Sequence, residues 1–308
     1  MVERPLRGEP PAFAVGFGAD PAPTSEAPAR RRLARAPRQL IVGAALLGLL
    51  VVLTVAAPLV SGDPNRLGLE EVLRPPTAGH WMGTDALGRD TAARVLRGGR
   101  VSLSVGLLSA GFALLIGLPT GALAGYRGGW ADALVSRAVE AVLCFPTLLL
   151  VLALLATAPA WLRSTTDVVR IALVLGLTGW VPVARYLRAE FVKLRRSDMV
   201  LAARSLGGGH VRIAALHILP SALAPVLVTA AFTVGAAIGL EAALSFLGLG
   251  VRPPVPTWGG LLAEAREHVD RAWWLAVFPG VALFAALLSC NLIGEGLRDL
   301  LDPRSSAR

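Results

Sequence analysis

Residues 40–60 read LIVGAALLGLLVVLTVAAPLV, an apolar run without a charged side chain. A helix that crosses the hydrocarbon core of a membrane needs roughly 20 such residues. The rest of the chain has the same character: of its 308 residues, 54% are hydrophobic and only 17% are charged, and the mean hydropathy is +0.61. Soluble domains carry about 25% charged residues. The sequence therefore predicts an all-α polytopic membrane protein.

Working outward from this run, six apolar segments have the length and composition of spanning helices. They lie at residues 40–60, 101–125, 141–157, 168–187, 221–247 and 273–297. Six spans place both termini on the same side of the membrane. Only a short connection, with Pro159 and Arg163, separates the third segment from the fourth.

The charge balance is basic, with 30 Lys and Arg against 21 Asp and Glu. These charges lie between the apolar segments, so we attribute them to membrane topology and expect no nucleic-acid partner. Basic residues are retained on the cytoplasmic side of a membrane. The segments on the side of the termini are the richer in Lys and Arg, so we expect both termini in the cytoplasm. Arg185 falls at the boundary of the fourth span.

The chain divides into four regions on this basis. Residues 1–38, rich in Pro, Ala and Arg, are expected to form a disordered, basic cytoplasmic tail. Residues 39–100 hold the first spanning helix and an extracytoplasmic segment. Residues 101–300 form a core of five spanning helices, and residues 301–308 are a second cytoplasmic tail.

The longest cytoplasmic connection, residues 188–219, has the pattern of a structured element. Ser197 can cap a helix, and Asp198 suits its positive N-terminus. The apolar residues that follow have the spacing of one helix face, at Met199, Ala202, Ala203 and Leu206. The pattern predicts a short amphipathic helix.

Three glycines at residues 207–209 end this helix sharply. A second helical stretch at residues 211–216 leads to Pro220, which can open the fifth span. A short helix on a tight turn is suited to docking a cytoplasmic partner. An amphipathic helix lying in the membrane interface is the alternative.

This connection resembles the EAA loop of ATP-binding-cassette importer permeases, which reads Glu-Ala-Ala, three residues, Gly, and later His-Ile-Leu-Pro. Here residues 201–207 read LAARSLG and residues 217–220 read HILP. Leu201 takes the place of the family's glutamate, which puts in doubt any ion pair made there. The resemblance implies that one group of residues couples to an ATPase: Val200, Leu201, Ala202, Ala203, Arg204, Leu206, Gly207 and His217.

Residues 80–90, HWMGTDALGRD, resemble the signature of the C-type permease subunit of dipeptide and oligopeptide importers. Other segments match the same subunit type, at residues 98–103, 124–126, 128–130, 145–146, 244–250, 253–254, 258–259, 296–299 and 302–303. The candidate residues for a gate or a binding-protein contact are Gly83, Thr84, Asp85, Gly88, Arg89 and Asp90. Alternatively, the charged ones form a turn that caps the second span with mutual ion pairs.

The resemblance implies a type I importer fold with six spanning helices in the cytoplasmic (inner) membrane of a bacterium. The implied partners are a second, B-type permease subunit, two cytoplasmic ATPases, an extracytoplasmic binding protein and membrane lipid. ATP and Mg²⁺ would bind to the ATPases, and this chain would hold no cofactor. Di- or oligopeptides are the implied substrates, with nickel and glutathione as alternatives in the same family.

Motifs for enzymatic chemistry are not found. A nucleotide-binding P-loop needs G-x-x-x-x-G-K-[ST], and the single lysine, Lys193, follows Phe191-Val192. The four histidines form no H-E-x-x-H motif, and we expect no catalytic or metal site. The energy for transport must therefore come from a partner.

One carboxylate, Glu241, lies well inside an apolar run. Charged residues within a membrane are functional candidates because burying them is costly. The alternative is that Glu241 lies near the outer end of the fifth span and reaches water or a subunit interface. A secondary transporter working alone would need more such residues or an inverted repeat. A membrane enzyme would need a catalytic cluster, which is not visible.

Overall fold

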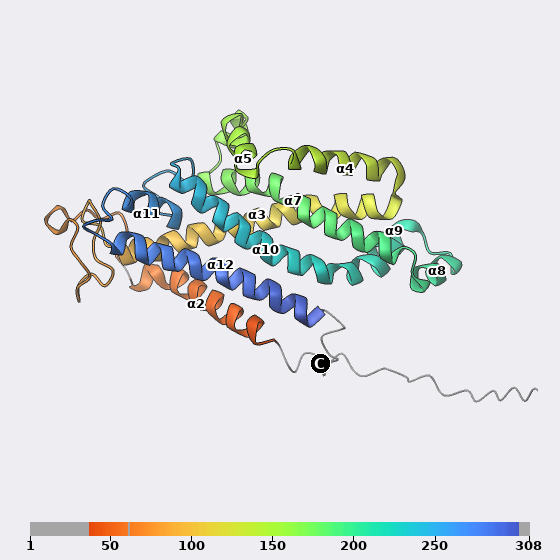
Figure 1. The fold of residues 1–308 in the computed structure, drawn as a ribbon, viewed down its shortest axis with the longest axis horizontal. Helices are drawn as coiled ribbons and strands as arrows, with labels where there is room; N and C mark the ends of the chain where they lie inside the picture. The colour runs from red at the N-terminus through yellow and green to blue at the C-terminus, as the bar shows by residue number, and fades with distance from the viewer. Residues whose placement is uncertain (1–36, 61, 302–308) are drawn as a thin grey trace, which may run out of the picture. The chain divides into compact units, whose positions relative to one another are not determined.

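The computed structural model describes residues 37–60 and 62–301. Within these residues the secondary structure is helical and no strand is formed. Five long helices lie along one another as a bundle (Figure 1). They are α2 (Arg38–Val60), α3 (Thr91–Arg127), α7 (Asp167–Leu194), α10 (Leu219–Phe246) and α12 (Trp274–Leu301). The regions expected to be terminal tails lie almost entirely outside the described residues.

Shorter helices connect these five. They are η2 (Leu69–Glu71), α4 (Gly129–Leu143), α5 (Thr147–Ala156), α6 (Ala160–Arg163), α8 (Asp198–Ser205), α9 (His210–Ile213), the π-helix η3 (Ala214–Ile218) and α11 (Trp258–Ala265). Together, α9, η3 and α10 form one continuous helical span from His210 to Phe246. Five spans are therefore long and apolar enough to cross a membrane, in agreement with five of the six predicted segments.

The remaining predicted span, residues 141–157, is not a straight helix. The chain there forms α4 and α5, which meet at an angle of 93°. Pro146 precedes α5, and proline lacks the N–H that would continue α4. With ten residues, α5 is about 15 Å long and cannot cross the membrane alone. Within residues 37–60 and 62–301, six spans are reached only if this bent pair counts as one.

The second span begins ten residues earlier than the sequence suggested, at Thr91. Asp90 caps the helix by accepting a hydrogen bond from the backbone N–H of Ala93 at 2.8 Å. The helix continues through Gly98 and Gly99 because other elements pack closely on them. A Cβ atom on Gly99 would lie 2.7 Å from the Trp258 ring. The boundary drawn between residues 100 and 101 therefore falls inside α3.

The closest helix pair, α3 and α7, packs through a row of small residues. Gly117, Gly121 and Gly125 recur every fourth residue on α3 and face α7. A Cβ atom on Gly121 would lie only 2.6 Å from the carbonyl oxygen of Ala184. In a membrane, small residues at this spacing let two helix backbones approach closely.

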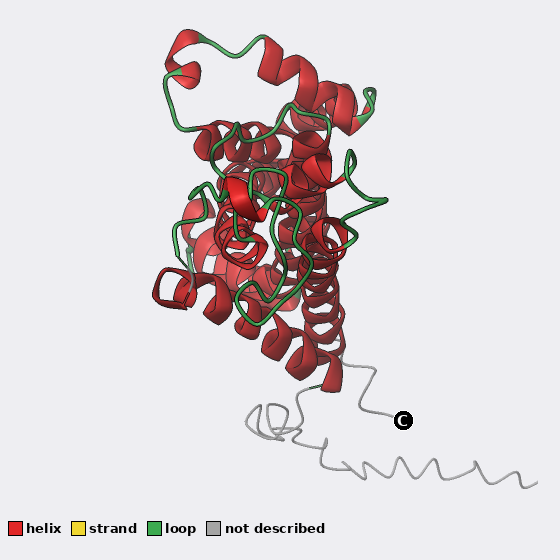
Figure 2. Ribbon diagram, turned by 90° about the vertical axis from the view of Figure 1, so that its left-hand side faces the viewer, coloured by secondary structure: helices red, strands yellow, loops and turns green. Residues whose placement is uncertain are grey.

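The two ends of the bundle differ in what they carry. The start of α2 lies beside the end of α12, because a Cβ atom on Gly296 would lie 2.6 Å from Leu40. The first and last described residues therefore lie close together at one end, where Figure 1 also shows α8 and α9. The opposite end carries α11 and the loop segments before α3, which Figure 2 views end-on.

Candidate functional site

The connection after α7 folds as the short helix and elbow that the sequence predicted. Helix α8 begins at Asp198, and Ser197 holds the N-cap position without a side-chain bond to the helix. Gly207 has φ +79°, a conformation that favours glycine, and so turns the chain sharply. The N–H of Gly208 then donates to the carbonyl of Ala203 at 3.0 Å. The elbow is therefore fixed by backbone geometry.

Val200 fastens α8 to the bundle. Its side chain is fully buried in a cluster with Phe191 of α7, Ile213 of α9 and Val226 of α10. Ala203 packs against the same cluster. This differs from the apolar stripe read from the sequence, because most of that stripe points away from the rest of this chain.

The side chains that α8 presents outward are largely apolar. Leu206 is 89% exposed, Leu201 is 52% exposed and Met199 is 42% exposed. Ala202, Arg204 and Gly207 are also exposed, whereas His217 is only partly exposed. A small helix that leaves its leucines uncovered has the character of a surface that another molecule covers.

At the opposite end of the bundle, Asp85 is the centre of a buried ion-pair network. Its Oδ1 accepts from the backbone N–H groups of Leu87 and Arg89, each at 2.9 Å. Its Oδ2 accepts from Arg89 Nε at 2.6 Å and from Arg94 Nη1 at 2.7 Å. Glu264 of α11 completes the network, accepting from Arg94 at 2.5 and 2.9 Å and from Arg89 at 3.1 Å.

The other signature residues fix the same turn. Gly88 has φ +70°, and a Cβ atom there would lie 1.8 Å from the carbonyl oxygen of Gly68, so only glycine fits. Thr84 donates to the carbonyl of Glu71, and its own carbonyl accepts from Trp274 Nε1 at 3.1 Å. Gly83 packs against the same tryptophan. The six signature residues thus lie together in a rigid, ion-paired turn that leads into α3.

His80 links η2 to the residue that caps α3. Its Nδ1 lies 2.7 Å from Asp90 Oδ2, and its Nε2 lies 3.0 Å from Glu71 Oε2. The hydrogen bond to Asp90 raises the pKa of His80 above 6.5; burial, the next largest effect, lowers it, and the hydrogen bond to Glu71 raises it again. Protonation of His80 is therefore favoured by its position between two carboxylates.

Glu241 is held inside the bundle between three elements. Its side chain is 0% exposed, so it does not reach water or a free surface. Ser102 of α3 donates to one carboxylate oxygen at 3.0 Å, and Ser245 of α10 donates to the other at 2.7 Å. The backbone N–H of Trp258 donates to Ser102 at 3.3 Å, which links α11 to the pair. This arrangement is that of a structural polar core.

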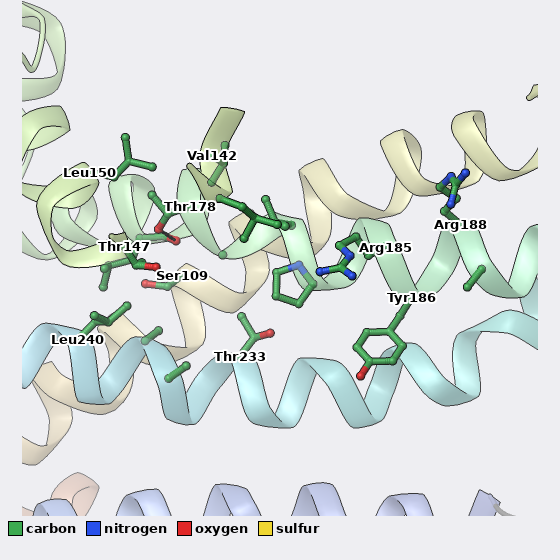
Figure 3. A pocket seen from close by; sticks show the side chains of 18 residues that line it. Ser109, Val142, Thr147, Leu150, Thr178, Arg185, Tyr186, Arg188, Thr233 and Leu240 are labelled. Carbon is green, nitrogen blue, oxygen red and sulfur yellow. Dashed lines mark hydrogen bonds between the residues drawn. The ribbon is translucent and has the colours of Figure 1, made fainter. Parts of the chain in front are cut away.

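A cavity of about 760 Å³ opens on one side of α7 (Figure 3). Its polar lining includes Ser109, Thr147, Thr178, Arg185, Tyr186, Arg188 and Thr233. A second hollow of about 650 Å³ adjoins it along α7 and α10, and its charged lining residues are Glu190, Lys193 and Arg298. The two share Pro182, Tyr186, Thr233 and Ala236.

Sequence reasoning missed the residues of this cavity, and also Arg94 and Glu264. Arg94 and Glu264 lie 170 residues apart, so their pairing has no local pattern. The sequence places Arg185 at the boundary of its span, whereas α7 continues to Leu194, nine residues further. The sequence does contain one indication of this site, because Arg185 is a charged residue in the apolar segment at residues 168–187.

The chain is similar in sequence to several transport proteins. Residues 117–307 match the family model of the binding-protein-dependent transport system inner membrane component. The dipeptide transport system permease protein DppC of Alkalihalophilus pseudofirmus is 38% identical, over 86% of this chain and 85% of that protein. The oligopeptide transport system permease protein OppC of Bacillus subtilis is 34% identical, over 88% and 87% respectively.

A third relative, the di/tripeptide transport system permease protein DppC of Pseudomonas aeruginosa, is 40% identical over 83% of this chain and 85% of that protein. Among solved structures, an inward-facing form of the MetNI methionine ABC transporter aligns with a TM-score of 0.54. The alignment covers 67% of this chain and 96% of the other at 20% identity. This likeness shows a shared fold.

Proposed function

Because this chain belongs to the family of inner membrane components of binding-protein-dependent transport systems, it is the permease component of an ATP-binding-cassette importer, and we propose that it carries di- and oligopeptides. A permease component forms the path and is not itself an enzyme. The family implies a second permease, an ATPase and a substrate-binding protein as partners. The peptide substrate is supported by relatives, named for dipeptides, oligopeptides and di/tripeptides, that cover most of this chain.

The proposed assembly contains one B-type permease, two cytoplasmic ATPases that bind ATP and Mg²⁺, and one extracytoplasmic binding protein. The end of the bundle with α8 faces the cytoplasm, in the inner membrane of a bacterium. The first and last described residues lie at this same end, which supports cytoplasmic termini. The opposite end, with Gly83–Asp90, faces the binding protein.

We further propose that α8 and its elbow dock into an ATPase. The single observation that carries this role is that α8 is anchored by Val200 yet leaves Leu206 89% exposed. Because α8 is anchored to the bundle, a movement of the ATPase would be transmitted through α8 to the spanning helices. The exposed apolar side chains of α8 would form the contact with the ATPase. Leu201, in place of the family's glutamate, is also exposed and would make that contact through apolar packing.

The signature turn serves, in this proposal, as a rigid platform at the outer mouth. Asp85, Arg89 and Arg94 are held by one another and by Glu264, so the turn moves with α3 and α11 as one unit. A movement of α3 would therefore be transmitted through this turn to the binding protein. Opening and closing at this end would then follow the tilt of the helices.

The test compares two leucine-to-aspartate variants at opposite ends. Leu206→Asp removes the outward apolar contact of α8, and Leu69→Asp is the control, since Leu69 is 73% exposed in η2. Burying a leucine contributes about 1.5–3 kcal/mol, so Leu206→Asp should weaken the ATPase contact about 10- to 100-fold. The measurements are ATPase recovered with the tagged chain and ATP-driven uptake of labelled tri-alanine.

Leu69→Asp should leave the recovery of ATPase at the wild-type level, because Leu69 lies at the end of the bundle opposite to α8. If Leu206→Asp recovers as much ATPase as the control and transports normally, α8 is an interfacial membrane helix and the docking role is wrong. If the wild-type complex takes up no peptide at all, the substrate proposal is wrong.

A further inference from the structure

The cavity beside α7 contains a cation that no residue in the described part of the chain neutralises. Two arginines line the cavity. One of them, Arg188, forms a bidentate salt bridge with Asp132 of α4, in which Nη2 and Oδ2 are 2.7 Å apart. Arg185 has an exposed side chain and forms no hydrogen bond or ion pair with any residue in the ranges 37–60 and 62–301. Figure 3 shows its guanidinium on the side of α7 that faces Thr233, near Tyr186.

Arg185 lies within a helix that is long and apolar enough to span the membrane, which makes its unpaired charge informative. It lies nine residues before the end of α7, about 13 Å along the helix axis. Ionisable side chains at such positions face the protein interior or a water-filled path and meet a partner there. The described residues that line the cavity include no carboxylate, thiol or imidazole. The lining therefore suits an anionic group and disfavours a free metal cation.

The opposite end of the cavity offers hydrogen-bond acceptors. Ser109, Thr147 and Thr178 gather there (Figure 3). The Ser109 hydroxyl donates its proton to the carbonyl of Val105 at 2.6 Å, and that of Thr178 donates to Leu175 at 3.0 Å. Both hydroxyl oxygens thus keep lone pairs for a donor within the cavity.

The separation of the two ends matches a short peptide. Thr178 and Arg185 are seven residues apart on one face of α7, which corresponds to about 10 Å. Three residues in an extended chain span about 10 Å. Between the two ends lie Val142 and the hydroxyl-bearing Thr233 (Figure 3), and Leu150 and Leu240 add apolar lining beside the hydroxyl end. A zwitterionic di- or tripeptide has the same pattern, a donor at one end and a carboxylate at the other.

We propose that Arg185 determines specificity by binding the C-terminal carboxylate of the peptide in transit, while Ser109, Thr147 and Thr178 accept hydrogen bonds from its N-terminal half. A guanidinium pairs with a carboxylate through two parallel hydrogen bonds. This inference rests on the proposed transport of peptides. It adds a selection step within the membrane to the one made by the binding protein.

The experiment uses the complete complex in proteoliposomes, with its binding protein saturated by labelled tri-alanine or by tri-alanine amide. The variants are Arg185→Lys, Arg185→Gln and Arg185→Glu. The control is Arg137→Gln, because Arg137 lies on α4 outside the cavity and pairs with an exposed Glu140. Co-purification of all subunits is measured for each variant.

Uptake of tri-alanine should fall in the order Arg, Lys, Gln, Glu. The loss for Arg185→Gln should be about tenfold, as expected for one charge-assisted hydrogen-bonding group. Uptake of the amide should be low in the wild type and unchanged by Arg185→Gln. Arg137→Gln should transport both peptides as the wild type does.

Wild-type tri-alanine uptake by Arg185→Gln would overturn the proposal, as would a rate order that ignores charge. Loss of the second permease from the Arg185→Gln complex, with both peptides affected equally, would overturn it too and assign Arg185 to a subunit contact. Absence of uptake in the wild type would instead refute peptide transport itself, so the two failures are distinguishable.

Discussion

Replacing Asp85 by alanine should destabilise the end of the bundle that carries the signature turn. The Asp85 side chain is 6% exposed and that of Arg94 is 3% exposed, so water replaces little of what is lost. The substitution removes two backbone hydrogen bonds and two ion-paired ones. Breaking a buried ion pair costs about 3–5 kcal/mol.

Both arginines keep Glu264 as a partner, so we expect the lower value of about 3 kcal/mol. At about 2–4 °C per kcal/mol, the midpoint of thermal unfolding should fall by about 6–12 °C. Asp85→Asn should cost less, because its amide oxygen still accepts from the N–H groups of Leu87 and Arg89.

The chain supplies its own reporter for this unfolding. Cys290 is 2% exposed and Cys144 is exposed, so a Cys144→Ser background leaves one thiol that reacts with a maleimide dye only on unfolding. The control is Glu70→Ala, an exposed carboxylate in the same outer segment. If Asp85→Ala lowers the midpoint by no more than Glu70→Ala does, the network does not hold this end together.

Two further predictions concern packing and pH. Gly121→Val should separate α3 from α7 and lower the stability by about 1–3 kcal/mol, as overpacking does. The control is Gly111→Val, because a side chain there would meet nothing within 4 Å and should change the midpoint of thermal unfolding little. Equal effects of the two variants on that midpoint would contradict the tight contact between α3 and α7. The raised pKa of His80 means that its stabilising contribution is full below about pH 6.5 and is lost as pH rises through the raised value. The midpoint difference between wild type and His80→Gln should therefore shrink from pH 5.5 to pH 8.5, and a difference that stays constant would refute the charged bridge.

Features coded by neighbouring residues could be predicted from the sequence. The apolar runs located five of the spans, and the Ser197–Asp198 start and the glycines after Leu206 located α8 and its elbow. The expectation of a charged turn that caps the second span is confirmed for Asp90, which caps α3. In each case the signal lies within a few turns of one helix.

Features that depend on packing could not be predicted. The run at 141–157 is apolar enough for a span, yet the chain bends at Pro146, and composition does not distinguish a bent pair from a straight helix. The pairing of Arg94 with Glu264 joins residues from distant helices. The cavity around Arg185 exists only once α4, α7 and α10 are placed, so no single segment indicates it.

The length of α3 has a mechanical consequence. Its 37 residues form one helix of about 55 Å, well beyond the roughly 30 Å of a bilayer's hydrocarbon core. One end bears Arg94, and the glycine row toward the other end locks it to α7, whose C-terminus leads into α8. The helix is therefore a lever: a tilt of about 5° at one end carries the other through about 5 Å. If α8 docks into an ATPase as proposed, a small tilt of α3 at that end moves the signature turn at the other end by several ångströms, and no helix has to bend.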